Sequence, residues 1–173
     1  IAQDDVMKSV KIVRVGKVAK KFNATTIFNT AFNEIGEKYK REAAEIERVS
    51  KLSKEDYSAE MLEQVKKIYP TVESSKSGLL YIIEKAGDQQ RVEKGHELTI
   101  HYKGTFRKDG KQFDSSYDRN QPMKFSYLEQ RMIPGFEEGL KLFGKGGKIK
   151  IIIPYFDAYG ANGRPGAIPP FAD

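Results

Sequence analysis

The chain of 173 residues contains no cysteine and only two histidines, and no apolar run approaches the length of a membrane span. The absence of cysteine excludes disulfide bonds, thiolate nucleophiles and cysteine-ligated metals. His96 and His101 alone are too few to build a zinc site. A membrane-spanning helix needs about 18 or more apolar residues in succession, so we predict no such helix. We therefore expect neither a metal nor a cofactor.

The basic surplus of the chain is modest, and it is spread out. The net charge is +6 at pH 7, and lysines and arginines occur throughout the sequence rather than in one segment. Nucleic-acid binding needs basic side chains gathered on one face. We therefore expect no nucleic-acid partner; a steep salt dependence of DNA binding would contradict this expectation.

The first 77 residues show secondary-structure signals but no motif that carries chemistry. Residues 6–15 are rich in β-branched residues and partly alternate, which predicts a strand, and residues 17–22 form a basic connector. From Ala24, apolar residues at spacings of mostly three or four predict a helix of about seven turns. Its stripe consists of Phe28, Phe32, Ile35, Tyr39, Ala43, Ile46 and Val49.

A second helix follows a capping box made by Ser53 and Asp56. Its apolar stripe is Tyr57, Met61, Val65 and Ile68. A helix with one apolar face must bury that face. Within residues 24–70, therefore, either the two helices pair as a hairpin or the longer one pairs with a second copy of the chain as a homodimer. The polar residues 71–77 are predicted to be a linker.

Short strands and turns dominate the second half. We predict strands over residues 79–85, 97–106, 123–127 and 147–153, and a short helix over residues 134–142 that begins with proline. Asp109-Gly110 is a strong hairpin signal, and the run Ile151–Ile153 favours a central strand. Strands with a single short helix predict an α+β domain, in which an antiparallel β-sheet curls around that helix.

Two motifs that suggest chemistry are better explained as local structure. The segment from Gly139 to Lys145 has phosphate-loop spacing, but a helix precedes it and Gly146 replaces the required Ser or Thr. Ser115 and Ser116 follow an aspartate but have no nearby base, so a local turn is the simpler interpretation.

Aromatic and aliphatic residues recur between residues 102 and 168, beside an early carboxylate and a late tyrosine. This predicts an apolar pocket that works by shape. The blocks His101-Tyr-Lys-Gly, Phe113-Asp-Ser-Ser, Met132-Ile-Pro-Gly-Phe, Ala158-Tyr-Gly and Gly166-Ala-Ile-Pro-Pro occur in one order. In order and spacing they resemble FKBP-type peptidyl-prolyl isomerases over residues 78–172.

The resemblance implies an FKBP-like fold, accelerated rotation of X-Pro bonds in proline-containing polypeptides during protein folding, and inhibition by the macrolides tacrolimus and rapamycin. Rotation breaks amide resonance, and an apolar site favours the less polar twisted state, so no acid–base chemistry is needed. The alternative is a proline-peptide-binding or chaperone module with little or no catalysis. Binding without rate enhancement would distinguish the two.

The resemblance also supplies roles for individual residues. As the catalytic residues, Tyr159 would donate its hydroxyl to the carbonyl of the rotating bond, and Asp114 would hold nearby polar groups and orient Tyr159 or a neighbour. Phe136 would be the pocket floor, where tryptophan is usual in the family. The implied substrate-binding residues are Tyr102, Phe113, Phe125, Met132, Ile133, Phe136, Ala167 and Ile168.

We expect three parts. Residues 1–16 are similar to the last strand of bacterial cyclophilin domains, residues 17–77 form a helical linker, and residues 78–173 form an FKBP-type domain. The family's final strand, which would follow the Pro-Pro segment, is absent, so we expect poor isomerase activity from the chain as given.

A start at Ile1 suggests a fragment or a mature form. The family resemblance favours the bacterial periplasm or cell envelope, and the cytoplasm remains open.

Overall fold

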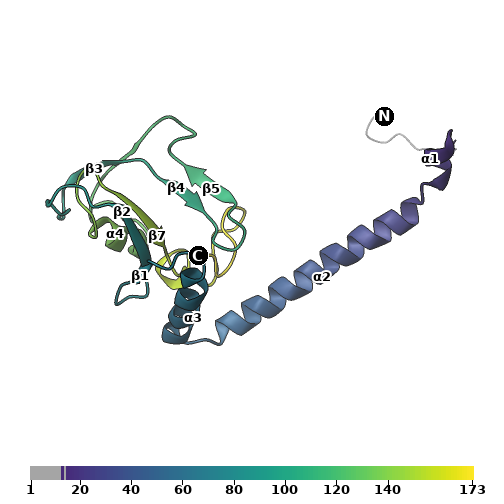
Figure 1. Cartoon of the computed structure of the whole chain (residues 1–173), viewed down its shortest axis with the longest axis horizontal. Coiled ribbons are helices and arrows are strands. Elements are labelled where there is room, and N and C mark those ends of the chain that lie inside the picture. The colour runs from purple at the N-terminus through teal and green to yellow at the C-terminus, as the bar shows by residue number, and fades with distance from the viewer. Residues whose placement is uncertain (1–12, 14) are drawn as a thin grey trace. The chain divides into compact units, whose positions relative to one another are not determined.

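The computed structural model describes Val13 and residues 15–173, and the chain divides into two compact units, Ile1–Ala43 and Ala44–Asp173 (Figure 1). Apart from Val13 and Val15, which are exposed and have no regular structure, the strand predicted over residues 6–15 lies outside the described residues. The cyclophilin-like interpretation of residues 1–16 therefore stays a prediction.

The first unit is helical. The expected connector contains a five-residue helix, α1 (Lys17–Lys21), and the predicted long helix is confirmed as α2 (Ala24–Ser50). The Asn23 side chain accepts a hydrogen bond from the Thr26 amide (3.1 Å) and so satisfies one of the free N–H groups at the start of α2. Within one chain the apolar stripe of α2 is exposed from Phe28 to Ile46, and Val49 at its end is buried. Phe28 and Phe32 stack on each other with ring centroids 5.8 Å apart.

The second helix, α3 (Lys54–Lys66), begins as predicted, because the Ser53 hydroxyl accepts a hydrogen bond from the Asp56 amide (3.0 Å). The helix buries Tyr57, Met61 and Val65, but the prediction for Ile68 was wrong: that side chain is 71% exposed. The cause is that α3 ends at Lys66, so Ile68 no longer follows the helical period.

The largest sheet has the strand order β1–β2–β7, with β1 (Glu73–Ser74), β2 (Leu80–Lys85) and β7 (Lys148–Ile152), all antiparallel. The segment predicted as a linker thus contributes a short strand. Leu80 lies opposite Ile152, and Ile83 lies opposite Ile149. The prediction that β7 is central was wrong for the described residues, where it pairs with β2 alone.

Two small sheets complete the domain. In one, β3 (Glu97–Ile100) pairs with β6 (Met123–Ser126); in the other, β4 (Lys103–Thr105) pairs with β5 (Gln112–Ser115) across the predicted Asp109-Gly110 turn. The single strand predicted over residues 97–106 is therefore broken at residues 101–102. There the buried Ser116 hydroxyl accepts a hydrogen bond from the Tyr102 amide (2.8 Å).

A helix covers each face of the largest sheet. On one face, Leu80 and Ile152 pack with the apolar residues of α3. On the other face, α4 (Pro134–Leu140) places Gly135 against Ile153 and Gly139 against Ile151. A 3-10 turn, η1 (Tyr155–Asp157), follows β7. The predicted α+β architecture of antiparallel strands around one short helix is confirmed.

Candidate functional site

Three of the predicted site residues form part of one apolar cluster between β6 and α4. Phe125 is almost fully buried, and its ring lies 6.2 Å from that of Phe136, measured between centroids. Met132 packs against the same cluster just before α4. The cluster also contains Tyr127, Leu140, Val92, Leu98, Ile100, Met123 and Phe143. Phe136, half-buried on the first turn of α4, thus lies among apolar neighbours.

A polar group lies across the β4–β5 pair. The Tyr102 hydroxyl and the Arg119 guanidinium both donate hydrogen bonds to the Asp114 carboxylate, and Arg119 also donates to the Tyr102 oxygen (3.0 Å). The hydrogen bond from Tyr102, together with that from Arg119, lowers the pKa of Asp114. Burial, together with the bond to Asp114, raises the pKa of Tyr102. At neutral pH the group is therefore a carboxylate held by a neutral phenol and a cation.

Phe113 is positioned by the backbone beneath it. Its ring lies over Gly104, where an added Cβ would come within 2.5 Å of the ring, and packs 4.9 Å from the Phe106 ring. The ring remains 41% exposed. Glycine at position 104 therefore lets an aromatic side chain lie flat across the hairpin and keep a face open to solvent.

Ile133 is the N-cap of α4, and its carbonyl accepts hydrogen bonds from the amides of Phe136 (3.0 Å) and Glu137 (3.2 Å). The Glu137 carboxylate accepts a hydrogen bond from the Met132 amide (2.9 Å), which fixes the approach to the helix. The Ile133 amide donates to no acceptor among residues 13 and 15–173. That leaves it available to a substrate carbonyl.

The remaining predicted residues lie in the loop after β7. Ile168 is buried and exchanges two backbone hydrogen bonds of 2.8 Å with Arg164, whereas Ala167 is exposed. Tyr159 is 36% exposed. The Tyr155 carbonyl accepts hydrogen bonds from the amides on either side of Tyr159, those of Ala158 and Gly160. The backbone around Tyr159 is thus held while its phenol stays accessible.

The sequence left two features of this region unpredicted. Asp114 contacts Tyr102, and no hydrogen bond among the described residues joins it to Tyr159. Arg119 was missed, because only the turn after β5 brings it back to Asp114. The expectation that Ser116 lacks a base was also wrong: His101 Nδ1 lies 3.0 Å from its hydroxyl. Ser116 is fully buried, however, and serves the backbone of Tyr102, so the pair is structural.

In the part of the chain that the structure describes, no three His, Asp or Glu side chains are arranged to hold a metal ion. None of the described helices is both long and apolar enough to cross a membrane.

The apolar cluster lies between β6 and α4, and the Asp114 group lies on the β4–β5 pair. A family model described as FKBP-type peptidyl-prolyl cis-trans isomerase matches residues 88–173. The crystal structure of FkpA from Escherichia coli superposes with a TM-score of 0.59 at 35% identity, covering 88% of this chain and 68% of that chain. The crystal structure of AtFKBP13 superposes with a TM-score of 0.53 at 32% identity, covering 58% of this chain and 89% of that chain.

The chain belongs to the FKBP-type peptidyl-prolyl cis-trans isomerase family. Among curated relatives, it is 47% identical over 92 residues to an isomerase named FkpA from Buchnera aphidicola subsp. Schizaphis graminum, a match that covers 53% of this chain and 35% of that protein. FkpA from Escherichia coli strain K12 is 46% identical over 99 residues, with 57% and 35% covered. The chain thus spans about a third of the length of these curated relatives.

Proposed function

We propose that this chain accelerates cis–trans rotation of X-Pro bonds in polypeptides, using residues 78–173 as the isomerase domain. The observation that carries the proposal is the cluster around Phe136, in which Phe125 and Met132 contribute the neighbouring surfaces. A proline ring is apolar and compact, and an aromatic floor with apolar sides suits it. Membership of the isomerase family supports the same conclusion.

The chemistry asks little of the side chains. Rotation crosses a barrier of ~18–20 kcal/mol because the amide loses its resonance. The twisted amide is less polar than the planar one, so an apolar surface shaped for it lowers the barrier without proton transfer. In this scheme the Ile133 amide orients a substrate carbonyl and the Tyr159 hydroxyl binds the carbonyl of the rotating bond. Ala167 and Ile168 close over the proline as a flap.

Asp114 has a supporting part in this proposal. Its carboxylate holds the Tyr102 phenol, so the Tyr102 ring keeps one orientation at the edge of the site. Phe113 extends the same edge. Neither Asp114 nor Tyr102 exchanges a proton with substrate.

Two-dimensional NMR exchange spectroscopy on a short X-Pro peptide tests the proposal directly. The cis–trans exchange rate should rise in proportion to protein concentration, and tacrolimus or rapamycin, as site ligands, should suppress the increase. Binding of the peptide without acceleration would overturn the catalytic proposal in favour of a proline-peptide-binding or chaperone module.

We propose that α2, the longer of the helices within residues 24–70, joins two copies of the chain. The support is the exposed stripe of α2, which carries Phe28, Phe32, Ile35 and Tyr39. Sedimentation equilibrium of the parent chain and of a Phe28→Ser/Phe32→Ser variant tests this. A dimer that the double variant converts to monomer is expected. A matched change on the polar side of α2, Asn33→Ser, should leave the dimer intact, and a monomeric parent chain would refute the idea.

We propose the bacterial periplasm or cell envelope as the location. The curated relatives come from bacteria, which is consistent with this proposal. Fractionation beside a periplasmic marker enzyme is the test, and recovery with the cytoplasmic fraction would contradict it.

A further inference from the structure

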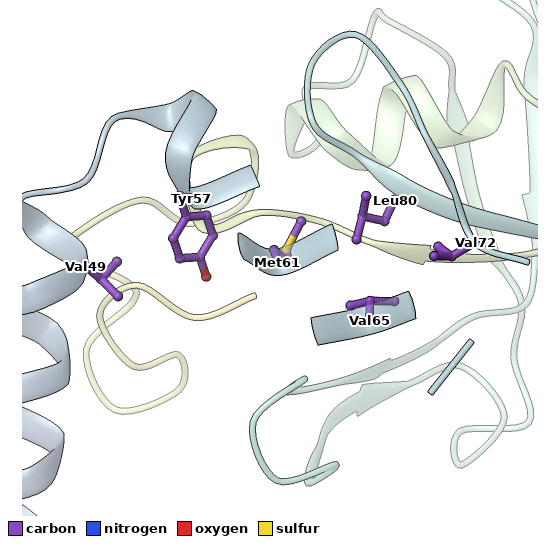
Figure 2. Packing of buried hydrophobic residues seen from close by; sticks show 6 residues of the cluster. All are labelled: Val49, Tyr57, Met61, Val65, Val72 and Leu80. Carbon is purple, nitrogen blue, oxygen red and sulfur yellow. The ribbon is translucent and has the colours of Figure 1, made fainter. Parts of the chain in front are cut away.

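Helix α3 belongs to the hydrophobic core of the domain. Six buried side chains form one cluster that joins the end of α2, the length of α3 and the sheet (Figure 2). These are Val49, Tyr57, Met61, Val65, Val72 and Leu80. Of the three α3 residues among them, Tyr57 makes ring contacts with η1 and donates a hydrogen bond to Asp173.

The ring of Tyr57 packs on the start of the loop that carries Tyr159. It makes edge contacts with the rings of Tyr155 (5.0 Å between centroids, 81°) and Phe156 (6.2 Å, 74°), both in η1. Tyr155 in turn contacts Phe171, near the other end of that loop, at 4.8 Å. Since the Tyr155 carbonyl also binds the amides flanking Tyr159, the ring of Tyr57 supports the backbone that presents the Tyr159 phenol.

The hydroxyl of Tyr57 is linked through Asp173 to the β4–β5 turn. It donates to Asp173 Oδ2 (2.8 Å), and the same oxygen accepts a hydrogen bond from Arg107 Nε (2.7 Å). Arg107 follows Phe106 in the β4–β5 turn and makes two more bonds. Its amide donates to the Asp173 carbonyl (2.8 Å), and its Nη1 donates to Gln64 on α3 (2.8 Å).

This network is largely shielded from water. The Asp173 side chain is 8% exposed and that of Arg107 is 29% exposed. Burial, reinforced by the Asp173 charge, raises the pKa of Tyr57, so its phenol stays a donor at neutral pH. A shielded ion pair that loses one hydrogen-bond partner cannot recover it fully from solvent, so the partners hold their relative positions.

We propose that Tyr57 and Arg107 are positioning residues that tie both sides of the proline site to α3: the ring of Tyr57 holds the loop bearing Tyr159, and the Tyr57–Asp173–Arg107 contacts hold the hairpin bearing Phe113 and Asp114. The proposal rests on the proposed isomerase function. It makes α3 a working part of the isomerase domain, although α3 precedes residue 78.

The test compares substitutions in the whole chain that remove a hydroxyl, a ring, a cation or part of an apolar side chain, near the site or away from it. Tyr57→Phe keeps the ring and removes the donor, whereas Tyr57→Leu removes the ring contacts. Val65→Ala weakens the packing of the same cluster but removes no ring contact and no side-chain hydrogen bond. Tyr69→Phe removes a phenol that accepts a hydrogen bond from Lys150, away from the site. Arg107→Ala and Arg107→Lys separate loss of the cation from a change in its geometry.

In NMR exchange measurements, Tyr57→Phe should lower kcat/KM about fivefold and Tyr57→Leu tenfold or more, mainly through kcat, because small displacements of positioned groups are costly. Arg107→Lys should recover part of the loss seen with Arg107→Ala. Val65→Ala and Tyr69→Phe should stay within twofold of the parent. Equal losses for Tyr57→Leu and Val65→Ala would reduce the effect to stability and overturn the proposal, as would a Tyr57→Leu variant within twofold of the parent.

A second readout does not depend on activity. In ¹H–¹⁵N spectra, Tyr57→Phe should shift the amides of Gly160 and of Ser115, one on each side of the site, whereas Val65→Ala should leave both in place. If the parent chain proves inactive, the proposed function fails, but these shifts still decide the positioning role. Shifts confined to α3 would refute it.

Discussion

The Tyr102 phenol donates a hydrogen bond to the Asp114 carboxylate across the β4–β5 pair, and Arg119 completes the group from the following turn. The three residues come from a strand break, a strand and a turn. They orient one aromatic ring at the edge of the proposed site. Strong acid protonates the Asp114 carboxylate and strong base ionises the Tyr102 phenol, so either condition should weaken the hydrogen bonds within the group.

The first prediction concerns pH. Because the folded-state pKa of Asp114 lies below its ordinary value of 3.8, the contacts stabilise the fold above that pH, and the contribution is lost as the pH falls through the folded-state pKa. Tyr102 sets the opposite limit: its pKa is raised above 10.0, so its contribution is present below pH 10 and is lost as the pH rises through the raised value. In thermal melts, the melting temperature of Asp114→Asn should fall less below pH 4 than that of the parent chain. An equal fall in the two proteins would contradict a stabilising role of the Asp114 carboxylate.

The second prediction concerns the floor of the site. Phe136→Ala should abolish most isomerase activity and cost about 2–3 kcal/mol of unfolding free energy, less than the usual value for a fully buried ring because Phe136 is half-buried. Phe143→Ala, in the same cluster but outside the proposed site, is the matched control. It should cost comparable stability in urea unfolding and retain activity. Near-normal activity of Phe136→Ala would place the site elsewhere.

The third prediction concerns the Tyr159 hydroxyl. Tyr159→Phe removes one hydrogen-bond donor and almost no volume, so the barrier should rise by about 1–2 kcal/mol, roughly the contribution of one hydrogen bond. The exchange rate of an X-Pro peptide measures this directly. A loss of several orders of magnitude would indicate acid–base chemistry and contradict a mechanism based on shape and polarity.

The fourth prediction concerns the contact between α4 and β7. A Cβ at Gly135 would meet the Ile153 side chain at 2.3 Å, so Gly135→Ala should destabilise the fold by about 1–3 kcal/mol. Adding Ile153→Ala should recover part of that loss in a double-mutant cycle measured by urea unfolding. Gly36→Ala is the control: no atom lies within 4 Å of its added Cβ, and the change should stabilise α2 by about 0.5–1 kcal/mol. Additive effects of the Gly135 and Ile153 changes would refute the proposed clash.

Signals of short range in the sequence predicted the helices and turns well. The start of α3 follows from the Ser53–Asp56 pair, and the β4–β5 turn follows from Asp109-Gly110. Periodicity identified the stripe of α3 but not its partner, because a stripe shows that a face is buried and not what buries it. Packing of that stripe on the β1–β2–β7 sheet is a tertiary fact.

In the candidate site too, the sequence predicted some residues and missed contacts that depend on the fold. Sequence motifs, through family resemblance, pointed to Phe125, Met132 and Phe136, and the structure brings these three into one cluster. The break between β3 and β4 was not predictable, because it depends on a hydroxyl from Ser116, fourteen residues beyond Tyr102. Arg119 was likewise missed, since its link to Asp114 depends on the path of the turn. The roles assigned to Tyr159, Ile133, Ala167 and Ile168 stay predictions.

The two glycines of α4 have a consequence for selectivity. With no side chain between helix and strand at Gly135 and Gly139, the main chain of α4 rests directly on Ile151 of β7 and on Ile153 just after it. Helix and strand should then move as one body, because glycine leaves no flexible side chain between them to take up a shift. The position of the Phe136 ring is consequently fixed by backbone contact, so the floor of the proposed site cannot move back to admit a larger group. Discrimination between a five-membered ring and a bulkier side chain would then follow from a depth that the fold holds constant.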